Sequence, residues 1–375
     1  MKDNRILSYI KEVIANMPAG WLSTTTHRLD IYDESLAKTQ FLDQFETLFN
    51  DQNAETSSLN ILPTAYDYIR LGHPLSCVLE WSIAKLNHLN ADSVISFSSK
   101  TTPILSILRK NLLDHKKTQI SYIGSLPDCF DAEIIKRVYG YDFELNPVSK
   151  LDDVKEFDGS TIFISQDSDM GSLNLNTRID FLISIQEELG SILVVNGTKN
   201  ESYVSAIQHV RRRETIAMTP ADSLTALKAL VGDSDQHSPK SQVKEDKAKV
   251  LSSIKSITVG HTDALVGSSG LSIQYAIMMG LIHDALEKHK GKAIKFIVPP
   301  NCYGGTNDQA RRVAACLDNV EVVDLPVDGD NDMVQSVDTV LAKIAHEDAV
   351  PYIIAEIPTN PRVEVPDLIK LRDAL

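Results

Sequence analysis

The chain has 375 residues, 43% of them hydrophobic and 23% charged, which is ordinary globular composition and enough length for two domains or one large one. Its 51 acidic residues outnumber its 37 lysines and arginines, so the formal net charge is −14. This excess of acid disfavours binding along a nucleic-acid backbone. The four cysteines form no Cys-x-x-Cys pair and fit a reducing compartment. We expect a cytoplasmic protein that binds neither nucleic acid nor a membrane.

The N-terminal part of the chain predicts helices. Residues 1–17 indicate an amphipathic helix, because Ile6, Ile10, Val13 and Met17 recur on one face. They lack the continuous apolar core of a signal peptide. We treat residues 1–58 as a helical leader.

From residue 60 onward, short apolar runs alternate with helical patterns. The expected strands are 93–97, 119–123, 161–165, 191–195, 214–218, 263–267, 295–299, 320–325 and 352–357. This alternation predicts an α/β fold with a mostly parallel sheet covered by helices.

A break in composition divides the chain. Residues 232–252 begin with a polar stretch rich in Ser, Asp and Lys, and indicate a linker. We therefore predict two related α/β segments, 59–231 and 253–375. The last residues, VPDLIKLRDAL, are typical of a helix. A further strand would be expected to follow them, so we expect the chain to be part of a longer protein.

Three short motifs follow expected strands of the second segment: Gly267-Ser268-Ser269-Gly270-Leu271, then Asn301-Cys302-Tyr303-Gly304-Gly305-Thr306, then Glu356-Ile357-Pro358-Thr359-Asn360-Pro361. The first can bind an anion with its backbone at a helix start, the second can lay a tyrosine ring over a flat ligand, and the third stiffens a loop with two prolines. Each alone is also typical of an ordinary turn. Ligand sites of α/β sheets lie beyond the carboxyl ends of strands, where all three motifs are expected.

The order of the three motifs resembles the Cys/Met-metabolism family of enzymes that use pyridoxal 5′-phosphate (PLP), such as cystathionine gamma-synthase and methionine gamma-lyase. The resemblance implies the PLP-dependent transferase fold of type I and PLP as cofactor. It implies that Ser269, Gly270 and Leu271 hold the cofactor phosphate and that Tyr303 stacks on the pyridine ring. Glu356 and Asn360 would lie near the O3′ side of that ring.

The first segment resembles the same family more faintly and as a degenerate copy. Tyr68 and Arg70 match a Tyr-x-Arg motif that reaches the phosphate in the neighbouring subunit of family dimers. Asn196 stands where the family has the Asp that pairs with the pyridine nitrogen. Ala221 stands where it has the Schiff-base lysine, and Lys100 replaces a glycine of the phosphate turn.

These matches lead to a hypothesis of an internal pseudo-dimer or a homo-oligomer, in which Tyr68 and Arg70 complete a site formed by the second segment. The implied activity is beta or gamma elimination or replacement on sulfur-containing or O-activated amino acids. The catalytic lysine is not in this chain, so we assign no catalytic residue, and we predict no metal site. Two alternatives stay open: a catalytically inactive PLP-fold protein with a binding or regulatory role, and an unrelated α/β enzyme that binds another phosphorylated ligand at Gly270.

Overall fold

A computed structural model describes residues 2–23, 34–63, 65–66, 69–166, 169–233, 240–327, 332–359 and 363–375, without the side chains of 2–4, 34–37 and 240–243. The chain forms two compact units. The first comprises Met1–Phe130 and Phe143–Ser269, and the second comprises Asp131–Asp142 and Gly270–Leu375.

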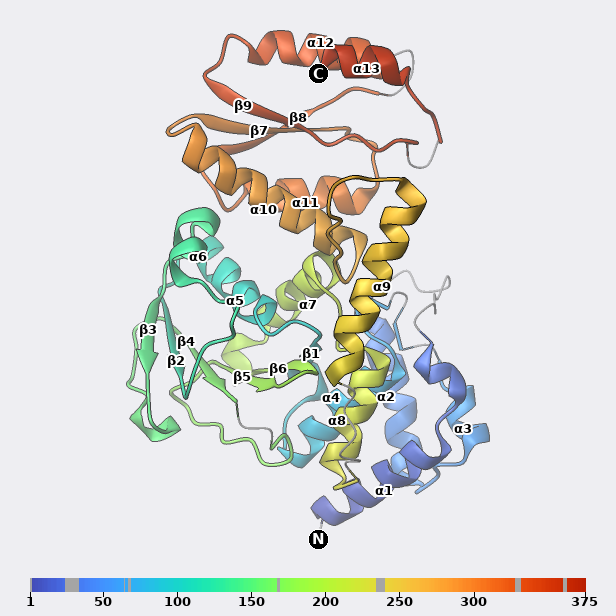
Figure 1. Ribbon diagram of the computed structural model, residues 1–375. Coiled ribbons are helices and arrows are strands. Elements are labelled where there is room, and N and C mark those ends of the chain that lie inside the picture. Colours follow the sequence, from blue (N-terminus) through green and yellow to red (C-terminus); the bar gives the residue numbers. More distant parts are fainter. Residues whose placement is uncertain are drawn as a thin grey trace. The chain divides into compact units, whose positions relative to one another are not determined.

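The first unit is built around a six-stranded sheet (Figure 1). Its strands are β1 (Val94–Phe97), β2 (Thr118–Tyr122), β3 (Glu144–Pro147), β4 (Ser160–Ser165), β5 (Phe181–Gln186) and β6 (Gly190–Val195). Its helices are α1 (Lys2–Asn16), α2 (Glu34–Asn50), α3 (Thr56–Ile61), α4 (Pro74–Leu86), α5 (Thr102–Leu113), α7 (Ser202–Glu214), α8 (Pro220–Leu230) and α9 (Lys240–Thr258). The α/β class predicted from the sequence is thus confirmed. Helix α9 covers most of the segment predicted as a linker, and the predicted division at 232–252 stays a prediction.

The six-stranded sheet is mixed rather than parallel throughout. In the order β1-β6-β5-β4-β2-β3, strand β6 runs antiparallel to both of its neighbours and the other pairs are parallel. The reason is a hairpin between β5 and β6, a connection that only antiparallel strands allow. Gly190 begins β6 at φ +120°, where an added Cβ would lie 2.0 Å from the carbonyl oxygen of Phe97, so the hairpin requires glycine at this position.

Two of the expected strands are absent from the described structure. Residues 214–218 include the end of α7 and a connection whose Ile216 oxygen and Ala217 nitrogen bond to Ser98 and Arg70. Residues 263–267 form an irregular exposed stretch in which the Leu265 side chain is 80% exposed. The sequence predictions were wrong because an apolar run becomes a strand only when a neighbouring strand offers a continuous hydrogen-bond ladder.

The second unit has a three-stranded parallel sheet in the order β8-β7-β9. Its elements are α6 (Ala132–Tyr139), α10 (Gly270–Lys288), β7 (Ala293–Val298), α11 (Gly304–Ala314), β8 (Val320–Asp324), α12 (Met333–Ile344), β9 (Ala349–Ile353) and α13 (Leu368–Ala374). Alternate residues of β7 face opposite layers: Ile294, Phe296 and Val298 pack in the core that includes α10 and α11, and Ile297 packs in the core with α12 and α13. Figure 1 shows these two helical layers on opposite sides of the sheet.

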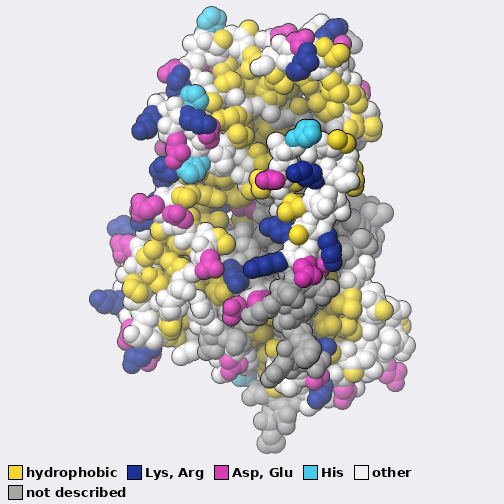
Figure 2. Space-filling view, viewed as in Figure 1, with side chains coloured by type: hydrophobic (Ala, Val, Ile, Leu, Met, Phe, Trp, Pro, Cys, Tyr) yellow, Lys and Arg dark blue, Asp and Glu magenta, His cyan; other side chains and the backbone are white. Residues whose placement is uncertain are grey.

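The second unit also leaves apolar side chains exposed. Those between residues 357 and 369 are Ile357, Val363, Val365, Leu368 and Ile369. Figure 2 shows hydrophobic side chains gathered on the visible face of this unit. Exposed patches of this kind are found at binding interfaces, and the expected homo-oligomer or pseudo-dimer stays a prediction. None of the described helices combines the length and apolarity needed to cross a bilayer.

A buried charge cluster joins the elements of the first unit. The Oε1 atom of Glu80 on α4 accepts hydrogen bonds from the backbone N–H of Ser96 on β1 and from Nη1 of Arg211 on α7, each at 2.8 Å. Its Oε2 atom lies 2.8 Å from Nζ of Lys38 on α2. The side chains of Glu80 and Arg211 are fully buried, and that of Lys38 is 3% exposed. Burial alone raises the pKa of Glu80, but Lys38 and Arg211 together lower that pKa to about 2.

Replacing Glu80 by Gln should destabilise the first unit strongly, because it leaves two buried cations without their anion. We expect a loss of about 3–5 kcal/mol in the free energy of unfolding. Both tryptophans of the chain, Trp21 and Trp81, are buried in this unit, so their fluorescence during urea unfolding measures the change. The control is Asp114→Asn, which breaks the solvent-exposed Lys110–Asp114 ion pair and should cost less than about 1 kcal/mol. Equal losses in the two variants would contradict the role assigned to Glu80.

His73 is a second buried ionisable group, at the start of α4. Its Nε2 atom lies 2.7 Å from the carbonyl oxygen of Met218, and its Nδ1 atom accepts the backbone N–H of Ser76. This pairing requires the neutral ring with its proton on Nε2. Burial lowers the pKa of His73 to about 4.

The proton that titrates is the second ring proton, which makes His73 cationic. Because the folded chain binds this second proton only at lower pH than the unfolded chain does, the stability of the first unit should fall as pH decreases from about 6.5 to about 4. The contribution of His73 to that slope is at most about 1.4 kcal/mol per pH unit. The variant His73→Asn keeps a preferred N-cap residue and should unfold with a shallower pH dependence in this window. The measurement is the urea midpoint by tryptophan fluorescence at several pH values, and parallel profiles for the two proteins would refute the assignment.

Candidate functional site

The second and third sequence motifs lie at one edge of the three-stranded sheet. Residues 301–306 follow β7, and Glu356 follows β9. Strands β7 and β9 are parallel neighbours, so their carboxyl ends share an edge, which is where ligands bind in α/β sheets.

Glu356 ties the two motifs together. Its Oε2 atom accepts a hydrogen bond of 3.0 Å from the backbone N–H of Tyr303, and its Oε1 atom lies 3.1 Å from Oγ1 of Thr306. Tyr303 is the N-cap residue of α11. A carboxylate at this place satisfies an N–H group at the helix start and interacts favourably with the helix dipole. Both oxygens of Glu356 therefore serve to hold the loop after β9 against α11.

The first motif joins the same network through α10. The side-chain amide of Gln309 on α11 donates a 2.9 Å hydrogen bond to the carbonyl oxygen of Leu271, and Oγ1 of Thr306 lies 3.2 Å from Oε1 of Gln274. A hydroxyl has one proton, so Thr306 cannot donate to both Gln274 and Glu356. Rotating the Gln274 amide would let its Nε2 atom, which is buried without a partner among the described residues, donate to Thr306. Thr306 would then donate to Glu356.

Two glycines of these motifs differ in what the fold requires. A Cβ at Gly305 would lie 2.5 Å from Cε1 of Tyr303 and 2.8 Å from Cδ1 of Leu271, so the tyrosine ring packs directly over a bare backbone. A Cβ at Gly270 would meet no atom within 4 Å, and Gly270 does not have a positive φ. The packing of the chain therefore does not explain why residue 270 is glycine, and open space lies beside it at the start of α10.

The structure places the predicted cofactor-binding residues as follows. Ser269 immediately precedes α10, Leu271 is buried, and the Tyr303 side chain is 37% exposed, so part of its ring remains accessible. Tyr68 and Asn360 lie outside the described residues.

Arg70 belongs to the first unit, where it is 4% exposed and its carbonyl oxygen accepts the N–H of Ala217. Gly270 belongs to the second unit. The predicted pairing of Arg70 with the turn at Gly270 therefore stays a prediction.

Sequence reasoning missed the side chains that connect the motifs. Gln274 and Gln309 lie within helices and outside the quoted motifs, and Thr306 ended a motif without being assigned a role. A signal was present, because Gln274 lies four residues after Gly270 and so projects from the same face of α10. Its partner on α11 could not be read from the sequence.

In the first unit, polar side chains at or beside the degenerate positions Lys100, Asn196 and Ala221 have structural roles. The hydroxyl oxygen of Ser99 accepts the N–H groups of Thr101 and Thr102 at the start of α5. The Asn196 amide donates to the carbonyl oxygens of Asn176 and Ile179. Thr219 caps α8, with its Oγ1 accepting the N–H of Asp222. The polar side chains at these positions are thus engaged in capping helices and bracing loops.

Comparison with known proteins gives only distant structural similarity. No protein-family model matches the chain, and no curated protein is similar to it in sequence. Among solved structures, metB from Corynebacterium glutamicum matches with 13% identity and a TM-score of 0.36, over 60% of this chain and 63% of that one. Cystathionine gamma-lyase from yeast matches with 12% identity and a TM-score of 0.37, over 60% and 62%. Cystathionine gamma synthase from Xanthomonas oryzae pv. oryzae matches with 10% identity and a TM-score of 0.35, over 68% and 69%. The chain thus spans less than two thirds of the length of the first two structures.

The close approach of Tyr303 to Gly305 predicts that an alanine substitution destabilises the second unit at Gly305 but not at its neighbour Gly304. Gly305→Ala should displace Tyr303 and Leu271 and cost about 1–3 kcal/mol. Gly304→Ala is the matched control, because a Cβ at Gly304 meets nothing within 4 Å and alanine favours the helix. Hydrogen exchange of the α11 amides measures the change, since the buried tryptophans report on the other unit. Equal protection in the two variants would rule out the proposed packing.

Proposed function

We propose that the second unit binds pyridoxal 5′-phosphate at the carboxyl edge of β7 and β9, within a PLP-dependent protein of the trans-sulfuration type. The fold would then be a divergent form of the type I PLP-dependent transferase fold. The observation that carries the proposal is the hydrogen-bond network that joins all three sequence motifs through Glu356, Thr306 and Leu271.

The residues present fit this cofactor in two respects. At Gly270, the unfilled space beside a helix start lets a phosphate approach the backbone N–H groups of the first turn of α10. At Tyr303, the accessible part of the ring provides an aromatic surface for a flat pyridine. The bonds from the Tyr303 backbone N–H and the Thr306 hydroxyl to Glu356 hold the start of α11 against the loop after β9, and the bond from Gln309 to the Leu271 carbonyl oxygen joins α11 to α10.

When bound, PLP supplies an electron sink for reactions at the α-carbon of an amino acid. The residues of this unit would bind its phosphate and orient its ring. Arg70, with a guanidinium suited to oxyanions, stays a proposed contact of the phosphate, as the family resemblance implies. The proposed reaction class is beta or gamma elimination or replacement on sulfur-containing or O-activated amino acids.

A second candidate is a catalytically inactive PLP-fold protein with a binding or regulatory role. The specific observation in its favour is the first unit, where Asn196 and Ser99 use their polar atoms to brace loops and cap a helix, and where Ala221 has no ionisable group. Release of 2-oxo acid or ammonia from O-acetylhomoserine, cystathionine or methionine in the presence of PLP distinguishes the two candidates. Turnover favours the enzyme and would contradict the inactive protein. Cofactor binding without turnover separates the two candidates only in a protein that also carries the lysine that the family resemblance implies.

Cofactor binding should require glycine at position 270, whereas folding should not, because an added Cβ there meets no atom of the chain within 4 Å. The probe is 4′-deoxypyridoxine 5′-phosphate, which lacks the aldehyde and cannot form adducts with surface lysines. We expect Gly270→Ala to weaken its binding about tenfold or more, because the new methyl group enters the space proposed for the phosphate. Equilibrium dialysis measures the dissociation constant.

The matched control is Gly280→Ala, on the same helix and equally free of contacts within 4 Å of the added Cβ. It should bind the probe like the unmodified protein. Pyridoxine, without the phosphate, should bind far more weakly than the probe. The proposed site would be refuted if both variants bound the probe with equal affinity, or if pyridoxine bound as tightly as the phosphorylated probe.

A further inference from the structure

Two glutamine side chains connect the start of α10 to α11. Gln309 on α11 is 1% exposed, and its amide donates a 2.9 Å hydrogen bond to the carbonyl oxygen of Leu271. Gln274 lies about one turn further along α10, with its Oε1 atom 3.2 Å from Oγ1 of Thr306. Thr306 belongs to the first turn of α11 and is only 3% exposed. These contacts hold the two helix starts against each other.

The Thr306 hydroxyl has one proton and faces two oxygen atoms. They are Oε1 of Gln274 and, at 3.1 Å, Oε1 of Glu356. An ionised carboxylate only accepts hydrogen bonds, and a bond to a charged acceptor is stronger than one to a neutral amide, so Thr306 donates to Glu356. The Gln274 amide must then present Nε2 to Thr306, because two facing oxygens repel. In the opposite orientation Nε2 is buried without a partner among the described residues, so turning the amide breaks no bond of that nitrogen.

We propose that Gln274 is a positioning residue, whose amide directs the Thr306 hydroxyl onto Glu356 and so holds the start of α11 beside the start of α10. The chain of bonds ends at Glu356, which also accepts the backbone N–H of Tyr303. The consequence for binding rests on the proposed function. The turn at Gly270 and the backbone of Tyr303 would be kept at a fixed separation, so the site would select a ligand that carries its phosphate and its ring on one rigid frame.

The direction of the chain can be tested on the full chain without any ligand, by two substitutions of similar size. In Gln274→Glu the new carboxylate cannot donate, so it competes with Glu356 for the single Thr306 proton and repels Glu356. In Gln274→Met that proton stays available to Glu356. Since the Tyr303 N–H donates to Glu356, we expect this amide to exchange at least about tenfold faster in Gln274→Glu than in the unmodified protein. In Gln274→Met it should change much less.

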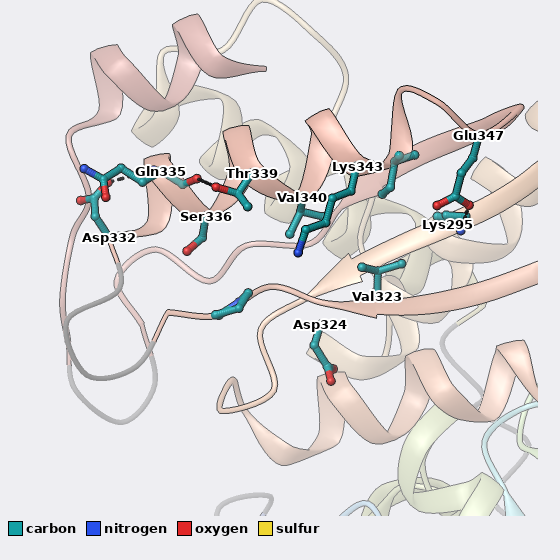
Figure 3. Close-up of a pocket in the computed structure, with 12 residues that line it drawn as sticks. Lys295, Val323, Asp324, Asp332, Gln335, Ser336, Thr339, Val340, Lys343 and Glu347 are labelled. Carbon is teal, nitrogen blue, oxygen red and sulfur yellow. Dashed lines mark hydrogen bonds and ion pairs between the residues drawn. The ribbon is translucent and has the colours of Figure 1, made fainter.

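The matched control is Gln335→Glu, the same substitution at an exposed position of the same unit. Gln335 lines the cavity between α12 and the sheet (Figure 3), on the other side of the sheet from α10 and α11, and should leave the Tyr303 amide unchanged. The amides of β7 serve as the reference for global stability. The proposal is overturned if Gln274→Glu keeps the protection of Tyr303 while Gln274→Met loses it, or if both variants exchange like the control.

The consequence for binding is tested at Thr306, in the middle of the chain. Thr306→Val removes the hydroxyl without adding charge, and Thr306→Ser keeps it. We expect Thr306→Val to bind 4′-deoxypyridoxine 5′-phosphate about tenfold more weakly, because the two helix starts are no longer held at one separation. Inorganic phosphate needs only the start of α10, so its binding should be unchanged. Thr306→Ser should bind both like the unmodified protein. Equilibrium dialysis measures the probe, and a phosphorus NMR titration measures the phosphate.

The two parts of this test fail in different ways. If Thr306→Val weakens the binding of phosphate as much as that of the probe, the loss does not come from the separation of the helix starts and the selection is refuted. If the unmodified protein binds no probe, the proposed cofactor site fails, whereas the exchange of the Tyr303 amide still decides the role of Gln274.

Discussion

The first unit depends on one fully buried carboxylate. Glu80 on α4 contacts Lys38 on α2, Ser96 on β1 and Arg211 on α7, so a single side chain joins three helices to an edge strand. An isolated charge in this position would be very costly, and the two cations with the Ser96 N–H make it tolerable. These contacts specify how α2, α4, α7 and β1 pack together, because a shift of any of these elements would leave a buried charge without its partner.

The second unit uses a carboxylate in a related way at its candidate site. Glu356 bonds to the N-cap backbone of α11 and to the Thr306 hydroxyl, and so fixes the loop after β9 to the helix that follows β7. This carboxylate is partly accessible, unlike Glu80, and it lies where ligands bind in α/β sheets. Its two hydrogen bonds fix the loop after β9 relative to α11. A contact between Glu356 and a cofactor would be an additional interaction.

The contrast between the two units explains why only one is proposed to bind a cofactor. At the start of α5 the Ser99 hydroxyl occupies the N–H groups of Thr101 and Thr102, which an anion would otherwise contact. Beside Gly270 the chain leaves space instead. Open space beside the backbone at a helix start lets an anionic ligand approach its N–H groups.

The sequence by itself determined the α/β class, the helix at 1–17 and most of the strands, because burial of apolar residues imposes a periodicity that can be read locally. It also located the motifs that meet at the edge of the second sheet. Only the tertiary structure decided the antiparallel placement of β6, the failure of 214–218 and 263–267 to form strands, and the bonds of Glu356 to Tyr303 and Thr306. Strand pairing, hydrogen bonds across loops and cavities all join residues distant in the chain, and no local pattern records which distant residue is the partner.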